Sequence, residues 1–359
     1  MAPLVHTLRS AYLDSSHRYK YLLYYGHNSS PSQHSRNYVL YPQLLPINLI
    51  MLLKTLLQTL VVSGLAAGVS IVEVLQSDPE LSTTLGVLNR LPDIVRTVTN
   101  TPGLTVFAPT NAAWDRIFGP LNQGIPDLEN RTNLLGEILR YHVLPSRLPT
   151  SAIDDRGVFR PTLLTNNFLT AVRPGQVIKA LRVPTTPVSF NITSGAGSQS
   201  IITKADIPFD KGGVAHVLNR VLTIPALVNN TAVVSEPPFT NFTDALNQAG
   251  ILDPFNEFTQ SATVFAPSNP AFAAFGPLPT GDRLRRLLEY HIVDSRIIRS
   301  TDLRVGQLIP TKNGQTVRVT SVGREISFNN VKAGPLTIDV PIKNGVLYEI
   351  DQVLTPPGF

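Results

Sequence analysis

The stretch LTVFAPTNAAWDRI, Leu104 to Ile117, is repeated further along the chain as ATVFAPSNPAFAAF, Ala262 to Phe275. In both stretches an unbroken run of apolar β-formers ends at a proline, which predicts a strand buried on both faces and then stopped. Asn111 and Asn269 are expected to be the N-caps of the helices that follow, because an asparagine side chain accepts from free backbone N–H groups. The same strand–helix unit therefore occurs twice.

Two further blocks recur in the same order. The matched pairs are LLGEILRYHVLPSRL (Leu134–Leu148) with RLRRLLEYHIVDSRI (Arg283–Ile297), and GGVAHVLNRVLTIP (Gly212–Pro225) with NGVLYEIDQVLTPP (Asn344–Pro357). Three collinear matches do not arise from composition, so the chain contains two copies of one domain. We place the first copy at residues 69–225, a linker at 226–235 and the second copy at 236–357.

Each copy has helical patterns early and strand patterns late, which predicts an α+β fold rather than alternating βαβ units. The middle block has the periodicity of an amphipathic helix, with His142 or His291 at its buried end. The last block alternates as a strand after a glycine-containing turn. Copy one is longer than copy two, so it carries loop insertions, and one is expected in the segment SGAGSQS at residues 194–200.

The ordered set of TVFAP followed by Ser or Thr and Asn, then Tyr-His after an amphipathic helix, then the final GV-x-[HY] strand, resembles the fasciclin domain family. The resemblance covers nearly everything from residue 69 onward. It implies two tandem domains, each a β-sandwich or wedge of about seven strands with helices packed against it. Members of this family are extracellular or cell-surface proteins of adhesion and matrix or cell-wall organisation.

The resemblance also implies binding positions, since a Tyr-His pair and an Asp-Ile pair take part in integrin binding in some animal members. The matching residues are Tyr141, His142, Asp206, Ile207, Tyr290, His291, Asp339 and Val340. Copy two departs from the pattern because Val340 replaces isoleucine. The residues themselves leave a structural role open: a histidine at the buried end of a helix fits a hydrogen-bonded core group, and an aspartate fits a turn or a strand edge.

The most apolar segment, residues 44–62, runs into the small-residue segment SGLAAG at 63–68, and the only methionines are Met1 and Met51. A chain that starts at Met51 would open with a well-formed secretory leader. We therefore predict a signal peptide at 51–68 and a mispredicted or disordered extension at 1–50. The alternative is a signal anchor that spans the membrane once. A leader implies secretion to the cell wall or matrix, with the vacuole as a second destination.

Residues 1–68 account for four of the five net positive charges, because the five basic residues in this segment are offset by a single acidic residue, Asp14. The remainder is almost neutral, so nucleic acid is not expected as a partner. Asn-x-Ser/Thr triplets are typical of glycosylated surface loops in secreted proteins. The predicted glycosylation sites are Asn130, Asn191, Asn229 and Asn241.

The chain has no cysteine, which excludes disulfides, thiol nucleophiles and cysteine-based zinc sites. It also lacks HExxH, GxSxG, P-loop and EF-hand patterns. We therefore expect no enzyme activity, no cofactor and no metal. Two kinds of partner stay open: a cell-surface protein for an adhesion role, or extracellular polysaccharide for a structural wall or vacuolar protein without a discrete receptor.

Overall fold

A computed structural model describes residues 11–13, 19–21, 68–119, 132–235, 238–253, 260–334 and 337–359. The predicted leader, apart from Gly68, and most of the extension before it lie outside these ranges. The described parts of the extension are the strands β1 (Ala11–Leu13) and β2 (Tyr19–Tyr21), which pair with each other. The chain separates into two compact units, Met1–Ser63 and Gly64–Phe359, and the second contains both repeats. None of the helices within the described ranges has the length and hydropathy needed to cross a bilayer.

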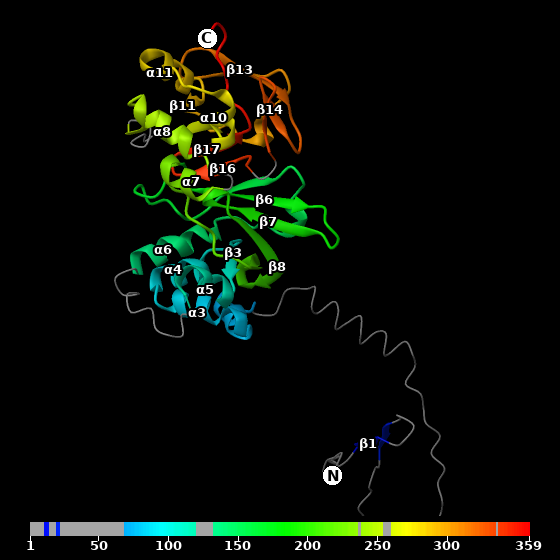
Figure 1. Ribbon diagram of the computed structural model, residues 1–359. Helices are drawn as coiled ribbons and strands as arrows, with labels where there is room; N and C mark the ends of the chain where they lie inside the picture. The colour runs from blue at the N-terminus through cyan, green and yellow to red at the C-terminus, as the bar shows by residue number, and fades with distance from the viewer. Residues whose placement is uncertain are drawn as a thin grey trace, which may run out of the picture. The chain divides into compact units, whose positions relative to one another are not determined.

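Each repeat forms a domain with its own sheet (Figure 1). The strands of the first domain are β3 (Thr105–Pro109), β4 (Val143–Leu144), β5 (Val158–Pro161), β6 (Val177–Val183), β7 (Ser189–Thr193), β8 (Gln199–Phe209) and β9 (Gly213–Leu218). Those of the second are β10 (Ala262–Pro267), β11 (Ile292–Asp294), β12 (Leu308–Pro310), β13 (Thr316–Ser321), β14 (Ile326–Phe328), β15 (Val331–Ala333), β16 (Val340–Ile342) and β17 (Gly345–Ile350).

The two sheets have the same topology. Among the described residues the first is ordered β4-β3-β9-β8-β7-β6-β5, and the second is ordered β11-β10-β17-β15-β14-β13-β12. The first block and the last block of each repeat pair as parallel neighbours, β3 with β9 and β10 with β17. The single long strand β8 is replaced in the second domain by β15 and β16, which both pair with β17.

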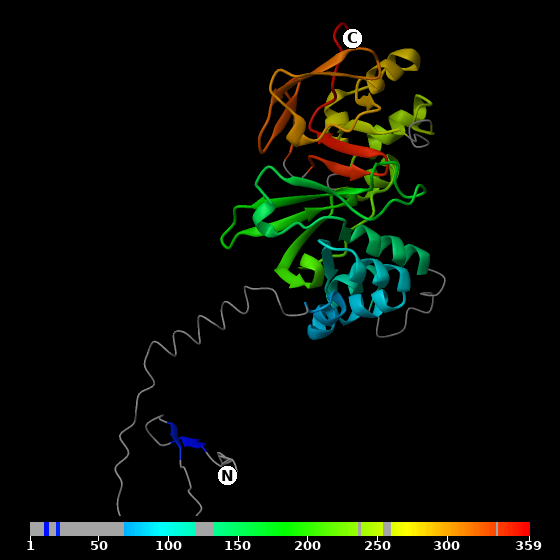
Figure 2. The same cartoon turned by 180° about the vertical axis from the view of Figure 1, so that it is seen from behind.

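The described helices of each domain precede all its strands but β3 or β10, and they lie together on one side of the sheet (Figure 2). They are α2 (Ile71–Ser77), α3 (Ser82–Asn89), α4 (Pro92–Asn100), α5 (Asn111–Phe118) and α6 (Thr132–Tyr141), then α7 (Val228–Val234), α8 (Thr240–Gln248), α10 (Asn269–Phe275) and α11 (Gly281–Glu289). Short 3-10 turns include η4 (Gly195–Gly197) and η6 (Ser300–Asp302). The predicted α+β class and the tandem domains are confirmed.

Each domain has two apolar clusters, one under the helices and one inside the curved sheet. Strand β3 supplies both: Val106 and Ala108 join the helix-side cluster, whereas Phe107 joins the other. Trp114 of α5 is fully buried in the helix-side cluster and donates from Nε1 to the Thr84 hydroxyl at 2.8 Å. The predicted strand buried on both faces is therefore confirmed, and alternation along it connects the two clusters.

The predicted N-caps are wrong by one residue. In the first domain the cap is Thr110, whose hydroxyl accepts the N–H of Ala113 at 3.2 Å, and in the second domain it is Ser268. The reason is that the hydroxyl residue still has extended backbone, whereas Asn111 already lies in the first turn. The amide of Asn111 instead accepts from Thr83 N at 2.9 Å, at the start of α3.

The same tie recurs in the second domain, where Asn269 Oδ1 accepts from Asn241 N at 2.9 Å at the start of α8. Each asparagine thus holds two helix N-termini together. The insertion expected in copy one within 194–200 is present but short: residues 194–198, which include the η4 turn, connect β7 to β8, and Gln199 and Ser200 already belong to β8. The corresponding turn of the second domain is Asn329–Asn330. A longer insertion of copy one lies at 162–176, between β5 and β6, where copy two has only 311–315.

Candidate functional site

The Tyr-His pair of the first domain is buried at the end of α6. His142 Nδ1 lies 2.7 Å from Ile138 O, and Nε2 accepts from Leu222 N at 2.8 Å. These partners require a neutral ring that carries its proton on Nδ1. The Tyr141 hydroxyl donates to Val177 O at 2.9 Å. The polar atoms of both side chains therefore form hydrogen bonds inside the domain.

The second domain repeats these bonds. His291 Nδ1 lies 2.9 Å from Leu287 O, its Nε2 accepts from Leu354 N at 2.9 Å, and the Tyr290 hydroxyl donates to Thr316 O at 2.8 Å. The pair therefore ties the helix end to the segment after the last strand and to the neighbouring sheet. Contact of these side chains with a partner stays a prediction, and it would require the domain to open locally.

The two buried histidines are expected to make the protein sensitive to acid. Burial lowers the pKa of His142 and of His291 to about 4, although a backbone hydrogen bond opposes the shift. A histidine with a depressed folded-state pKa stabilises the fold above its ordinary pKa of about 6.5, and that contribution is lost as the pH falls through about 4. We expect up to about 3 kcal/mol of lost stability per ring.

Urea unfolding at pH 7, 5.5 and 4.5 checks this expectation. His291→Gln is expected to lower stability at pH 7 while it reduces the steepness of the fall toward pH 4.5, because one titrating group is gone. An unchanged slope in this variant would show that the histidine is not the group that takes up protons on unfolding.

The two predicted aspartates occupy equivalent positions in the repeats. Both have a left-handed backbone, with φ of 56° at Asp206 and 61° at Asp339, a conformation that aspartate tolerates better than most residues. Asp206 Oδ1 accepts from Thr150 N at 2.9 Å, and Asp339 Oδ1 accepts from Ser300 N at 2.7 Å. Their neighbours, Ile207 and Val340, pack against the helix-side clusters.

The environments of the two carboxylates differ sharply. Asp339 is fully buried, and its Oδ2 lies 2.7 Å from Nζ of Lys179, a first-domain residue whose side chain is 8% exposed. Its Oδ1 also accepts from the Tyr348 hydroxyl at 3.0 Å. Asp206 is exposed and has the Thr150 hydroxyl as a second partner. One predicted binding carboxylate is therefore enclosed where the two domains meet, and the other faces outward.

Further bonds between the domains surround the Lys179–Asp339 ion pair. Gln176 Nε2 donates to Ile342 O at 3.1 Å, and the guanidinium carbon of Arg299 lies 5.1 Å from the centroid of the Phe159 ring. Strand β16 lies against the η4 turn of the first domain. The segment that carries Asp339 is thus covered by the sheet end of the preceding domain.

The predicted glycosylation sites lie on regular elements where the structure describes them, not on loops. Asn191 is on β7 and half-buried, Asn229 is on α7 and half-buried, and Asn241 is exposed on α8. Asn130 lies outside the described residues. Occupancy of all four stays a prediction, and exposure favours Asn241.

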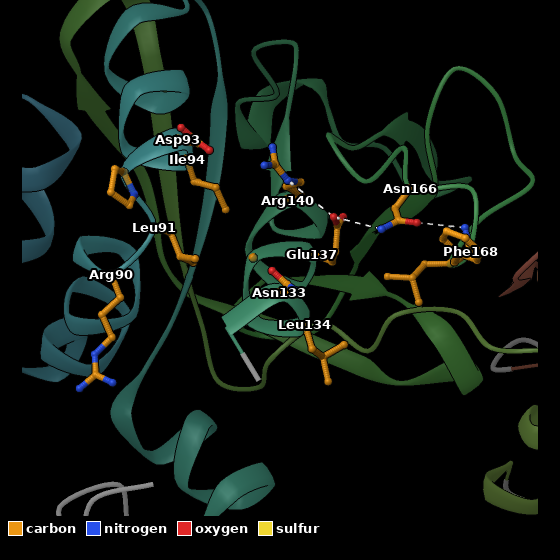
Figure 3. A pocket seen from close by; sticks show the side chains of 13 residues that line it. Arg90, Leu91, Asp93, Ile94, Asn133, Leu134, Glu137, Arg140, Asn166 and Phe168 are labelled. Atoms are coloured by element: carbon orange, nitrogen blue, oxygen red, sulfur yellow. Dashed lines mark hydrogen bonds and ion pairs between the residues drawn. The ribbon is translucent and has the colours of Figure 1, made fainter. Parts of the chain in front are cut away.

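A surface groove of about 650 Å³ opens on the first domain, between the start of α4, the outer face of α6 and the loop at 166–169 (Figure 3). Glu137 Oε1 accepts from Asn166 Nδ2 at 3.3 Å and lies 3.9 Å from Arg140 Nε. The Phe168 ring on the same loop is 87% exposed. The groove thus combines a carboxylate, an amide, a guanidinium and an aromatic ring.

The sequence pattern did not single out these groove residues. Asn166 and Phe168 lie in the insertion at 162–176, so a gapped alignment of the two repeats could have marked them as particular to copy one. Glu137 and Arg140 look like ordinary solvated positions of an amphipathic helix. Among the described residues, no three histidine, aspartate or glutamate side chains are placed to hold a metal ion.

The chain belongs to the fasciclin domain family, whose model matches residues 79–225 and 237–356. A fasciclin-like arabinogalactan protein of Arthroderma benhamiae is 26% identical over 77% of this chain and 64% of its own length. Human periostin is 29% identical over 70% of this chain and 28% of its own length. The chain therefore spans less than two thirds of these two relatives.

Two other proteins are also similar to this chain. The aurofusarin biosynthesis cluster protein S of Gibberella zeae is 27% identical over 80% of this chain and 77% of its own length. Among solved structures, a FAS1 domain pair from the insect cell adhesion molecule fasciclin I matches 77% of this chain and 97% of that chain, at 19% identity and a TM-score of 0.36.

Proposed function

We propose that this chain is a secreted or cell-surface protein that acts in adhesion to a cell wall or extracellular matrix through non-catalytic binding. Membership of the fasciclin family supports this role, as do relatives whose names include a fasciclin-like arabinogalactan protein and periostin. The histidines at the predicted positions are neutral, buried and doubly hydrogen-bonded, which suits a scaffold rather than general acid–base chemistry.

The groove of the first domain is the observation that favours polysaccharide as the partner. Sugar rings present hydroxyl groups around an apolar C–H face. A carboxylate, an amide and a guanidinium supply both acceptors and donors for hydroxyls, and the exposed Phe168 ring offers a flat apolar surface beside them. A carbohydrate ligand would use all of these groups, which an apolar peptide would not.

The test is retention of the full secreted protein on isolated wall polysaccharide and on intact cells. Phe168→Ala is expected to weaken retention on polysaccharide about tenfold, the equivalent of about 1.4 kcal/mol. The matched control is Val233→Ala on α7, which removes an exposed apolar side chain that does not line the groove. Equal binding by both variants would contradict the groove assignment, and retention on cells alone would favour a protein receptor.

We propose that residues 51–68 direct the chain into the secretory route, where the sequons receive glycans. The sequence of the predicted leader supports this route, as does the similarity to a fasciclin-like arabinogalactan protein and to periostin. Enzymatic removal of N-glycans from protein isolated from its natural source is expected to lower its mass, and Asn241→Gln is expected to remove one glycan. A mass that does not change on this treatment would contradict the route.

A further inference from the structure

The two domains are repeats, so each of the two surfaces that form the contact between them has a counterpart on the other domain. On the first domain the contact surface is the cross-strand pair Phe159 and Lys179 of β5 and β6. On the second it is Asp339 and the β16 segment that follows it. Each domain therefore carries a basic sheet end and an acidic strand segment, and only one of each is used within the chain.

The unused basic surface lies on the second domain. Leu308 and Arg318 are cross-strand partners in β12 and β13, as Phe159 and Lys179 are in β5 and β6. Here they are uncovered: Arg318 is exposed, and Leu308 is 54% exposed although it is a large apolar side chain. The Asn329–Asn330 turn, which corresponds to η4, lies at the same end of the sheet, and Asn330 is exposed.

The unused acidic surface lies on the first domain. Asp206 shares the left-handed φ of Asp339 and the same hydrogen bond from the 3-10 segment before β5, yet it is exposed whereas Asp339 is fully buried. Two residues after Asp206, Pro208 is exposed. Its counterpart two residues after Asp339, Pro341, is buried. Within the described residues Asp206 forms no ion pair. Burial acts to raise its pKa, but the hydrogen bonds from Thr150 and the nearby charges of His216 and Arg147 lower it.

We propose that a second copy of this chain docks head to tail, with Arg318 and Leu308 of one molecule against Asp206 and Pro149 of the next. Arg318 then takes the place of Lys179, and Asp206 that of Asp339. Leu308 takes the place of Phe159, and Pro149 takes the place of Arg299. An apolar contact between Leu308 and Pro149 thus replaces the cation–π contact between Arg299 and Phe159. The free surfaces are complementary in charge, and they continue an interface that the chain already forms.

This contact is heterologous, because the two molecules use different surfaces. A heterologous contact that does not close into a ring leaves one free end of each kind and builds an open linear assembly. The proposed contact includes an ion pair between exposed side chains, so we expect association that rises with protein concentration and weakens with salt. An open assembly also multiplies weak binding sites along one particle, which raises avidity for an extended surface.

Sedimentation velocity of the full secreted protein over a wide concentration range tests the proposal. The weight-average mass of the wild type is expected to increase past the dimer without a plateau. Arg318→Glu alone and Asp206→Arg alone are each expected to weaken association at least tenfold, because like charges then face each other. Asp206→Asn serves as a second variant, since it retains the side-chain acceptor and tolerates the left-handed φ while it removes the charge.

The decisive sample is an equimolar mixture of the Arg318→Glu and Asp206→Arg proteins. The carboxylate introduced at position 318 of the first protein can then pair with the guanidinium introduced at position 206 of the second. At the other kind of contact, the native Arg318 of the second protein pairs with the native Asp206 of the first. The mixture is therefore expected to recover association that neither protein shows alone. Absence of association in the wild type, a mass that stops at a dimer, association unaffected by either charge reversal, or failure of the mixture to recover would each overturn the proposal. Unfolding midpoints confirm that each variant is folded.

Discussion

Replacement of Lys179 with methionine is expected to lower the free energy of unfolding by about 3–5 kcal/mol. Methionine has a similar length, but it leaves the fully buried carboxylate of Asp339 without its cation. A buried charge that loses its partner retains the cost of its desolvation and loses the attraction that offset it. Urea unfolding followed by circular dichroism at pH 7 measures the difference.

The repeat supplies the matched control, because Arg318 occupies the position of Lys179 in the second domain but is exposed. Arg318→Met is expected to change the unfolding free energy of the monomer by less than about 0.5 kcal/mol. The double variant Lys179→Met with Asp339→Asn is expected to recover part of the loss, since no charge then remains buried. Equal stability of the Lys179→Met protein and the wild type would show that the ion pair does not form in solution.

Glu349→Val is expected to stabilise the protein by about 2–3 kcal/mol at pH 8 and by much less at pH 5. Glu349 on β17 is 6% exposed, and its Oε1 has no hydrogen-bond partner among the described residues. The first domain has fully buried Val217 at the equivalent position of β9. The first domain thus accommodates a buried valine at this position of the repeat, so we expect the second domain to accommodate one too.

The pH dependence follows from the direction of the pKa shift. Burial raises the pKa of Glu349 to about 7. The stabilising contribution of a group with a raised folded-state pKa is complete below its ordinary pKa of about 4.3 and is lost as the pH rises through about 7. Comparison of wild type and variant at each pH between 5 and 8 cancels the contribution of the histidines. A difference in stability that stays constant over this range would contradict the assignment.

The ion pair also changes how the predicted binding positions are understood. Asp339 and Val340 are buried in the structure, so a partner could reach Asp339 only after the domains separate. Asp206 needs no such separation, because it is exposed. If binding occurs at this motif, substitution of Asp206 should weaken it directly. Substitution of Asp339 should act mainly through the stability of the domain pair.

The repeated blocks, the α+β order of elements and the strands buried on both faces could all be predicted from the sequence. These features depend on interactions between residues a few positions apart: an apolar run, a proline that ends it, and a hydroxyl or amide beside free N–H groups. The error at the helix start, with the cap at Thr110 rather than Asn111, arose because two adjacent residues both had capping side chains.

The tertiary structure alone decided which of two equivalent aspartates is buried and which faces outward. Lys179 and Asp339 are far apart in sequence, and no local pattern distinguishes Asp339 from Asp206 or Lys179 from Arg318. The same holds for Glu349, which is buried together with every other residue of β17, and for the groove beside Glu137. Burial and charge pairing are set by contacts between distant segments, so equivalent positions in the two repeats have different physical properties.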